Sequence, residues 1–200
     1  MAYTHAEQAL SAQDPDMAAL IKRNGHIARA PREDYFASLA GSIIGQQISV
    51  KAAAKILERF KTTTKMEPSV VASLSDEQAK AIGLSGQKYK YLTDLAEHFV
   101  RDSMVFNHLD TLSDDEVIAE LTKVKGIGVW TAQMFLMFTL VRLDVFAPDD
   151  RGLQLGIKKL YGLDEVPERS ELEAIAAKWA PYRTVASWHL WHSLDNEPAT

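Results

Sequence analysis

The sequence of 200 residues contains no cysteine. This absence excludes disulfide bonds, thiolate nucleophiles, cysteine-ligated zinc and iron–sulfur clusters, so packing of the core must stabilise the fold. No apolar run reaches the roughly 18 residues that a membrane-spanning helix needs. The first ten residues also lack the basic start and apolar core of a signal peptide. We therefore expect a cytoplasmic protein that makes no contact with a membrane.

Basic residues are fewer than acidic ones. The chain has 22 Lys and Arg against 27 Asp and Glu, which gives a formal net charge of −5. Proteins that hold nucleic acid on a broad surface usually do so with clustered Lys and Arg. Any contact with DNA must therefore be local.

Stretches that alternate between apolar and polar residues are also missing, whereas signals for helices are frequent. Apolar residues recur at spacings of three, four and seven, which places them on one helix face. Three capping boxes mark helix starts: Ser75 with Gln78, Ser113 with Glu116, and Ser170 with Glu173. The sequence predicts an all-α fold with helices near 15–24, 34–47, 50–62, 76–82, 87–102, 113–123, 128–141, 150–161, 170–179 and 182–193.

Glycine and proline interrupt this pattern only briefly, and no stretch resembles a flexible linker. With 46% hydrophobic residues, the chain can bury a substantial core. We expect one compact domain over residues 1–200, built as a two-lobed helical bundle. The lobes are predicted over approximately 34–140 and 1–33 plus 141–200, with a cleft between them that holds the site.

The most informative stretch is 121–136, LTKVKGIGVWTAQMFL. One helix ends at the Gly-Ile-Gly turn of 126–128, where two glycines let the backbone reverse, and another helix begins at once. The new helix presents amides near Gly128 and Trp130 and the positive end of its dipole. A phosphate can bind there without a basic side chain, helped by Lys125. By itself, the turn is better explained as a tight connection between packed helices.

Two consecutive carboxylates, Asp149 and Asp150, follow a proline and precede an apolar-periodic helix. By position alone, either of them fits an ordinary helix N-cap. An anion at this place fits equally well a site where positive charge develops during a reaction.

Two segments resemble the helix-hairpin-helix DNA glycosylases, most closely the 3-methyladenine DNA glycosylase II (AlkA) type: VKGIGVWTA at 124–132 and VFAPDD at 145–150. Further matching segments occur in the order of the family: SIIGQQIS at 42–49, GLSGQKY at 83–89 and WAPYR at 179–183. The resemblance covers roughly residues 30–195, nearly the whole chain.

This resemblance implies a monofunctional enzyme of base excision repair that acts on double-stranded DNA. We expect a monomer, nucleoid-associated if bacterial. It would excise alkylated purines of the 3-methyladenine type by hydrolysing the N-glycosidic bond, and would leave an abasic site. The family pattern assigns the essential carboxylate to Asp150, with Asp149 as the alternative. An anion there stabilises the positive charge that develops on the deoxyribose.

A base pocket is also implied by the resemblance. An extruded cationic base is held best against electron-rich aromatic faces. Trp130 and Trp191 match aromatic pocket positions of the family, and Phe36 and Met134 are further candidates for lining the pocket. Met134 stands where the bacterial enzyme has Tyr, which leaves the base preference open. By position alone, each Trp fits the core better than a pocket.

Residues expected to contact DNA follow from the same resemblance. Gln47 occupies the position of the residue that inserts into the minor groove, where the bacterial enzyme has Leu. A helix-terminal polar role explains Gln46 and Gln47 equally well. The remaining expected contacts are Gly86, Gln87, Lys88, Lys125, Gly126, Gly128 and Thr131.

Cofactors and strand cleavage are not expected. No organic cofactor motif is present, and the resemblance implies only a structural Na⁺ or K⁺ ion on the backbone carbonyls of Thr122, Val124 and Ile127. Relatives that also nick the backbone place a Schiff-base Lys where this chain has Trp130. Other functions stay open: a glycosylase for other damaged or mismatched bases, an enzyme that acts on free nucleosides or RNA, a non-catalytic helix-hairpin-helix DNA-binding module, and an interaction scaffold.

Overall fold

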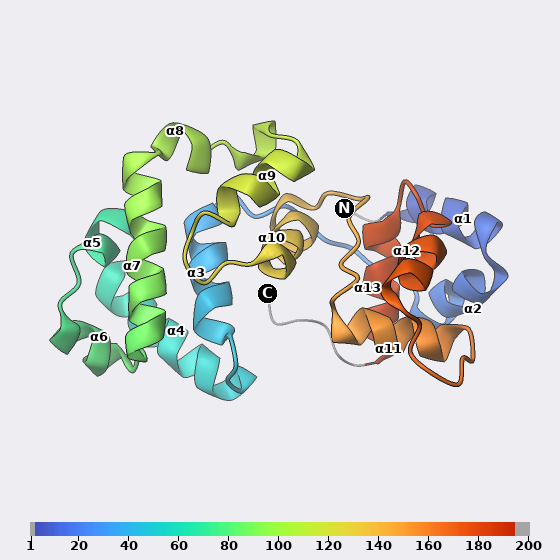
Figure 1. Cartoon of the computed structure of the whole chain (residues 1–200), viewed down its shortest axis with the longest axis horizontal. Coiled ribbons are helices and arrows are strands. Elements are labelled where there is room, and N and C mark those ends of the chain that lie inside the picture. The colour runs from blue at the N-terminus through green and yellow to red at the C-terminus, as the bar shows by residue number, and fades with distance from the viewer. Residues whose placement is uncertain (1–2, 195–200) are drawn as a thin grey trace. The chain divides into compact units, whose positions relative to one another are not determined.

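The regular structure of the chain is helical throughout. The computed structural model describes residues 3–194, and no β-sheet occurs in that range (Figure 1). The predicted all-α fold is therefore confirmed. Residues 1–2 and 195–200 of the predicted second lobe lie outside the described residues.

Two compact units divide the described chain. Residues 32–135 form the first, which we call the hairpin unit, and residues 3–31 and 136–194 form the second, which we call the aspartate unit. No helix in the described part of either unit is long and apolar enough to cross a membrane.

The hairpin unit is organised around α7 (Gly86–Arg101), which packs against α3 and α5. Leu92, Leu95 and Phe99 form its buried stripe, at the spacing of three and four residues that one helix face requires. The other helices of this unit are α3 (Tyr35–Gly45), α4 (Val50–Thr64), α5 (Pro68–Ala72), α6 (Asp76–Ile82), α8 (Ser103–Phe106), the 3₁₀ helix η1 (Leu109–Thr111), α9 (Asp114–Leu121) and α10 (Val129–Phe135).

The aspartate unit is organised around α13 (Arg183–Ser193), whose residues from Thr184 to Trp191 are all buried. Helices α1, α2 and α11 contact it. Gly156 of α11 allows a close approach, since a Cβ there would lie 3.0 Å from the Leu190 side chain. The other helices are α1 (Thr4–Gln13), α2 (Pro15–Asn24), the π-helix η2 (Leu136–Leu140), α11 (Arg151–Leu160) and α12 (Arg169–Ala177).

The helix predicted over 128–141 is present as α10 followed directly by η2, so the helical stretch covers residues 129–140. Its last five residues form π-helical turns, which stop where Val141 takes a φ of 56°. The capping box predicted at Ser170 is wrong: the carboxylate of Glu171 accepts a hydrogen bond from the amide of Glu168, which places the helix start two residues earlier.

A buried acid–base cluster connects α1 to α13 in the aspartate unit. Glu7 is 2% exposed and accepts hydrogen bonds from the Ile27 amide (2.9 Å) and the His26 ring (2.5 Å). His189 is fully buried, and its Nε2 lies 3.3 Å from Oε1 of Glu7 without the alignment of a hydrogen bond. Burial opposes the charge of Glu7, but the hydrogen bonds outweigh it and lower the pKa of this carboxyl. Burial lowers the pKa of His189.

We expect this cluster to make the fold acid-sensitive in two steps. Below about pH 6.5, the ordinary pKa of histidine, His189 binds a proton in the unfolded chain but stays neutral in the folded chain, where its pKa is lower. The unfolded state then binds more protons, so the free energy of unfolding falls as the pH falls. The second step begins near pH 4.5, where unfolded Glu7 protonates before the folded carboxyl does.

Urea unfolding between pH 8 and 4 measures both steps. A His189→Gln variant should lose the first step and keep the second. An unchanged pH profile in that variant would show that His189 titrates alike in both states.

Candidate active site and nucleic-acid interface

The Gly-Ile-Gly turn connects α9 to α10 and presents backbone amides. Gly126 has a φ of +85°, which glycine adopts without steric cost, and a Cβ there would lie 2.2 Å from the ring of Tyr91. The amides of Gly126, Gly128 and Val129 donate to no acceptor within residues 3–194. An anion that binds at the turn can therefore accept several hydrogen bonds from the backbone.

Two side chains hold this turn, one from Gln46, the C-cap residue of α3, and one from α7. The Gln46 side-chain amide donates to the Gly126 carbonyl at 3.0 Å. Asp94 of α7 accepts from the Lys125 amide at 2.9 Å and from the Lys125 ammonium at 2.6 Å. The structure therefore holds Gln46 and Lys125, both expected to contact DNA, in bonds within the protein.

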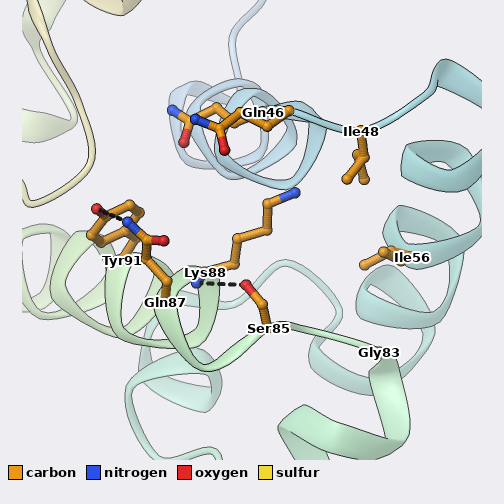
Figure 2. A pocket seen from close by; sticks show the side chains of 9 residues that line it. Gln46, Ile48, Ile56, Gly83, Ser85, Gln87, Lys88 and Tyr91 are labelled. Carbon is orange, nitrogen blue, oxygen red and sulfur yellow. Dashed lines mark hydrogen bonds between the residues drawn. The ribbon is translucent and has the colours of Figure 1, made fainter.

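A cavity of about 240 Å³ adjoins this region of the hairpin unit (Figure 2). The Lys88 side chain points across it and donates to the Ile44 carbonyl at 2.6 Å, and burial lowers the pKa of its ammonium. Gln47 adopts a φ of 57°, an uncommon conformation for a residue other than glycine. The cavity is lined by Gln46, Gln47, Ile48, Ile56, Gly83, Ser85, Gln87, Lys88 and Tyr91.

This cavity brings together Gln46, Gln47, Gln87 and Lys88, which the sequence places in segments about forty residues apart. Gly86 begins α7 and is exposed beside it. The first turn of α7 presents backbone amides at this edge, as the start of any helix does. The predicted contacts of these two segments thus share one surface of the hairpin unit.

Asp150 is the N-cap residue of α11 in the aspartate unit. Its Oδ1 accepts hydrogen bonds from the Leu153 amide and from the Trp191 indole N–H, both at 2.8 Å. The residue is 7% exposed. Asp149, in contrast, is exposed and forms an ion pair with Arg169 at 2.7 Å. The two consecutive carboxylates therefore have different surroundings, and only Asp150 is buried.

Gly152 belongs to this site and was not among the residues predicted for it. A Cβ at this position would lie 2.9 Å from the Trp191 ring and 3.0 Å from Oδ1 of Asp150. Any larger residue would therefore push the indole away from the carboxylate. With Gly156 it forms a G-x-x-x-G pattern on α11, which was a sequence signal for close packing against another helix.

The predicted base-pocket residues fall in both units. Trp191 is 1% exposed, and its ring centroid lies 5.3 Å from that of Phe138. In the hairpin unit, Phe36 and Met134 are buried, whereas Trp130 is 37% exposed near the start of α10. The buried Thr131 follows Trp130 on the same helix.

The carbonyls proposed for a monovalent cation lie at the same hairpin. The Val124 carbonyl accepts a hydrogen bond from the Ile127 amide at 3.1 Å, and a carbonyl oxygen has a second lone pair. Within residues 3–194 there is no cluster of three or more His, Asp or Glu side chains that could hold a metal ion.

Comparisons with known proteins identify the family of the chain. A family model described as HhH-GPD superfamily base excision DNA repair protein matches residues 40–182. The chain is 31% identical to DNA-3-methyladenine glycosylase 1 of Schizosaccharomyces pombe over 196 residues, which cover 94% of this chain and 86% of the relative.

Two solved structures are similar over most of their length. The S. pombe 3-methyladenine DNA glycosylase (Mag1) in complex with abasic DNA matches with a TM-score of 0.83 and 31% identity, covering 96% of this chain and 97% of that one. A DNA-3-methyladenine glycosidase from Bacillus halodurans matches with a TM-score of 0.83 and 36% identity, covering 94% and 88%. The chain belongs to the HhH-GPD superfamily of base excision DNA repair proteins.

Proposed function

We propose that this protein is a DNA glycosylase that removes alkylated purines, of which 3-methyladenine is the type, and leaves an abasic site. The observation that carries the proposal is the carboxylate of Asp150, held by the Leu153 amide and the Trp191 indole. The name of the S. pombe relative supports the same substrate class. The abasic DNA in the similar S. pombe structure corresponds to the proposed product.

The chemistry needs one well-placed anion. As the bond between C1′ and the base nitrogen breaks, its electron pair leaves with the base and positive charge grows on the deoxyribose. The Asp150 carboxylate stabilises that charge and orients the water whose oxygen bonds to C1′, and the proton that this water loses passes to solvent. Alkylation at N3 or N7 already makes a purine cationic, so the base leaves without a dedicated general acid.

Binding of DNA is assigned to the hairpin unit. The unbonded amides of Gly126, Gly128 and Val129 would hold a phosphate of one strand. The first turn of α7, with Gly86 and Gln87, would contact the other strand. Gln47, in its left-handed conformation, would fill the space that the extruded base leaves.

The product is proposed to be an intact strand with an abasic site. Trp130 occupies the position where a Lys would form a Schiff base with the sugar. Lys125, nearby in the sequence, has its ammonium bound to Asp94. A Na⁺ or K⁺ ion on the carbonyls of Thr122, Val124 and Ile127 would steady the turn without taking part in the reaction. We further propose that the protein acts as a monomer in the compartment that holds the DNA.

A panel of duplex oligonucleotides tests the proposed activity. Duplexes with an alkylated, a deaminated or an oxidised base are incubated with the protein, and abasic sites are revealed by hot alkali. We expect cleavage after alkali only in the alkylated duplexes, and no adduct when borohydride is added. Release of other bases alone would assign a different glycosylase, and binding without any release would indicate a non-catalytic DNA-binding module in which Asp150 only caps α11.

Replacing the indole that holds Asp150 should slow base release. Trp191→Phe keeps an aromatic ring but removes the N–H donor, so the carboxylate loses one donor and keeps the Leu153 amide. We expect single-turnover base release to fall about tenfold, which corresponds to about 1.4 kcal/mol. Trp188→Phe is the matched control, because the Trp188 Nε1 is buried with no hydrogen-bond partner among the described residues. Equal losses in both variants would show that ring volume matters and the hydrogen bond does not.

A further inference from the structure

Asp94 is a buried carboxylate that the proposed reaction does not use. It lies in the middle of α7 and is 8% exposed. Removing a carboxylate from water is costly unless it is paired and hydrogen-bonded. Its presence between α7 and the hairpin therefore requires compensating partners.

Lys125 provides two hydrogen-bond donors to Asp94, one from its backbone and one from its side chain. Its backbone amide donates to Oδ2 of Asp94 at 2.9 Å, and its ammonium donates to Oδ1 at 2.6 Å. His98, one turn further along α7, has its Nδ1 3.7 Å from Oδ2. Burial opposes ionisation of Asp94, but the hydrogen bonds from Lys125 outweigh it and lower the pKa of the carboxyl.

The two hydrogen bonds have different consequences for the turn. The bond to the amide fixes the backbone immediately before Gly126, where the unbonded amides begin. The bond to the ammonium engages a side chain that is otherwise 72% exposed and neutralises its charge. Lys51 and Lys55 of the same unit, in comparison, form no ion pair within the described residues.

We propose that Asp94 is a positioning residue for DNA binding that acts in two opposed ways. Through its bond to the Lys125 backbone amide, it orders the hairpin amides that would bind a phosphate. Through its bond to the Lys125 ammonium, it keeps that charge from pairing with a DNA phosphate. This inference rests on the proposed function, in which the hairpin holds a phosphate. The net effect is a hairpin that binds DNA through its geometry more than through its charge, in agreement with the formal net charge of −5.

Two substitutions of Asp94 separate these effects. Asp94→Asn keeps an oxygen that can accept from the Lys125 amide but removes the charge that holds the ammonium. Asp94→Ala removes both. Fluorescence anisotropy with an undamaged duplex gives the affinity of each variant over a series of salt concentrations, and thermal unfolding checks that each is folded.

We expect the two variants to change the affinity in opposite directions. In Asp94→Asn the released ammonium should raise the affinity several-fold at about 0.1 M salt and steepen the slope of log affinity against log salt by about 0.9, the value for one added phosphate contact. In Asp94→Ala the affinity should fall about tenfold, because the turn loses its backbone anchor. Lys125→Met should change the slope little in the wild type and should cancel the steeper slope of Asp94→Asn.

Three results would overturn the inference. If Asp94→Asn and Asp94→Ala lost DNA affinity equally and the slope of log affinity against log salt did not change, Asp94 would only stabilise the fold. A slope lowered by about 0.9 in Lys125→Met alone would show that Lys125 contacts phosphate despite Asp94. Failure of the wild type to bind duplex DNA would remove both this inference and the proposed function. The expected pattern in a protein that releases no base would remove only the enzymatic proposal.

Discussion

Asp150→Asn should lower single-turnover base release by about 10² to 10³, the usual cost of removing one electrostatic group from a reacting centre. The fold should survive, since Asn caps helices as well as Asp does and its Oδ1 can still accept from the Leu153 amide and the Trp191 indole. DNA affinity should stay within a few-fold of the wild type. Release of base from an alkylated duplex and anisotropy with the same duplex measure the two effects.

Asp149→Asn is the matched control for this prediction. It removes a neighbouring carboxylate of the same charge, but Asp149 is exposed and paired with Arg169. An exposed ion pair contributes little to stability, so neither activity nor folding should change appreciably. Near-normal turnover in Asp150→Asn, or a larger loss in Asp149→Asn, would assign the chemistry to another residue.

Gly126→Ala should disrupt the hairpin. The new Cβ would lie 2.2 Å from the Tyr91 ring, and alanine would have to hold a φ of +85°. Strain of this kind and the displacement of Tyr91 together should lower the free energy of unfolding by about 2–4 kcal/mol. Affinity for duplex DNA should fall with it, because the amides that follow are no longer aligned. Urea unfolding and anisotropy measure the two losses.

Gly128→Ala provides the comparison within the same turn. A Cβ at this position meets nothing within 4 Å, and no positive φ is required. As the cap of α10, alanine is a weaker residue than glycine, so a loss below about 1 kcal/mol is expected. If both substitutions had the same effect, the close approach of Tyr91 to Gly126 would have no part in stabilising the hairpin.

Much of the fold follows from local signals in the sequence. Apolar residues at spacings of three and four predicted the longer helices, and the boxes at Ser75 and Ser113 mark real helix starts. The short helices α5 and α8 were missed, because four or five residues are too few to establish a periodicity. Helix α1 was also missed, because the buried Glu7 interrupts its apolar pattern. The error at Ser170 arose because two residues of this segment, Glu168 and Ser170, each have a Glu three positions later, and the sequence alone does not show which of them caps the helix.

The candidate site was predictable in its residues but not in its contacts. The Gly-Ile-Gly turn and the Asp pair are visible as motifs, and the resemblance distinguished Asp150 from Asp149. The bonds from Trp191 to Asp150 and from Lys125 to Asp94 join residues 41 and 31 positions apart, and no local pattern encodes such a pairing. The left-handed Gln47 is also set by tertiary packing, because the intrinsic preference of Gln is against it.

Affinity for a charged mimic of the sugar would test directly whether the Asp150 carboxylate faces a cationic deoxyribose. A duplex that carries a pyrrolidine in place of one nucleotide is positively charged at the position where charge develops, and a tetrahydrofuran duplex is its neutral counterpart. The wild type should bind the pyrrolidine duplex at least about tenfold more tightly, and Asp150→Asn should lose that preference. An equal preference in both proteins would contradict the assigned role of this carboxylate.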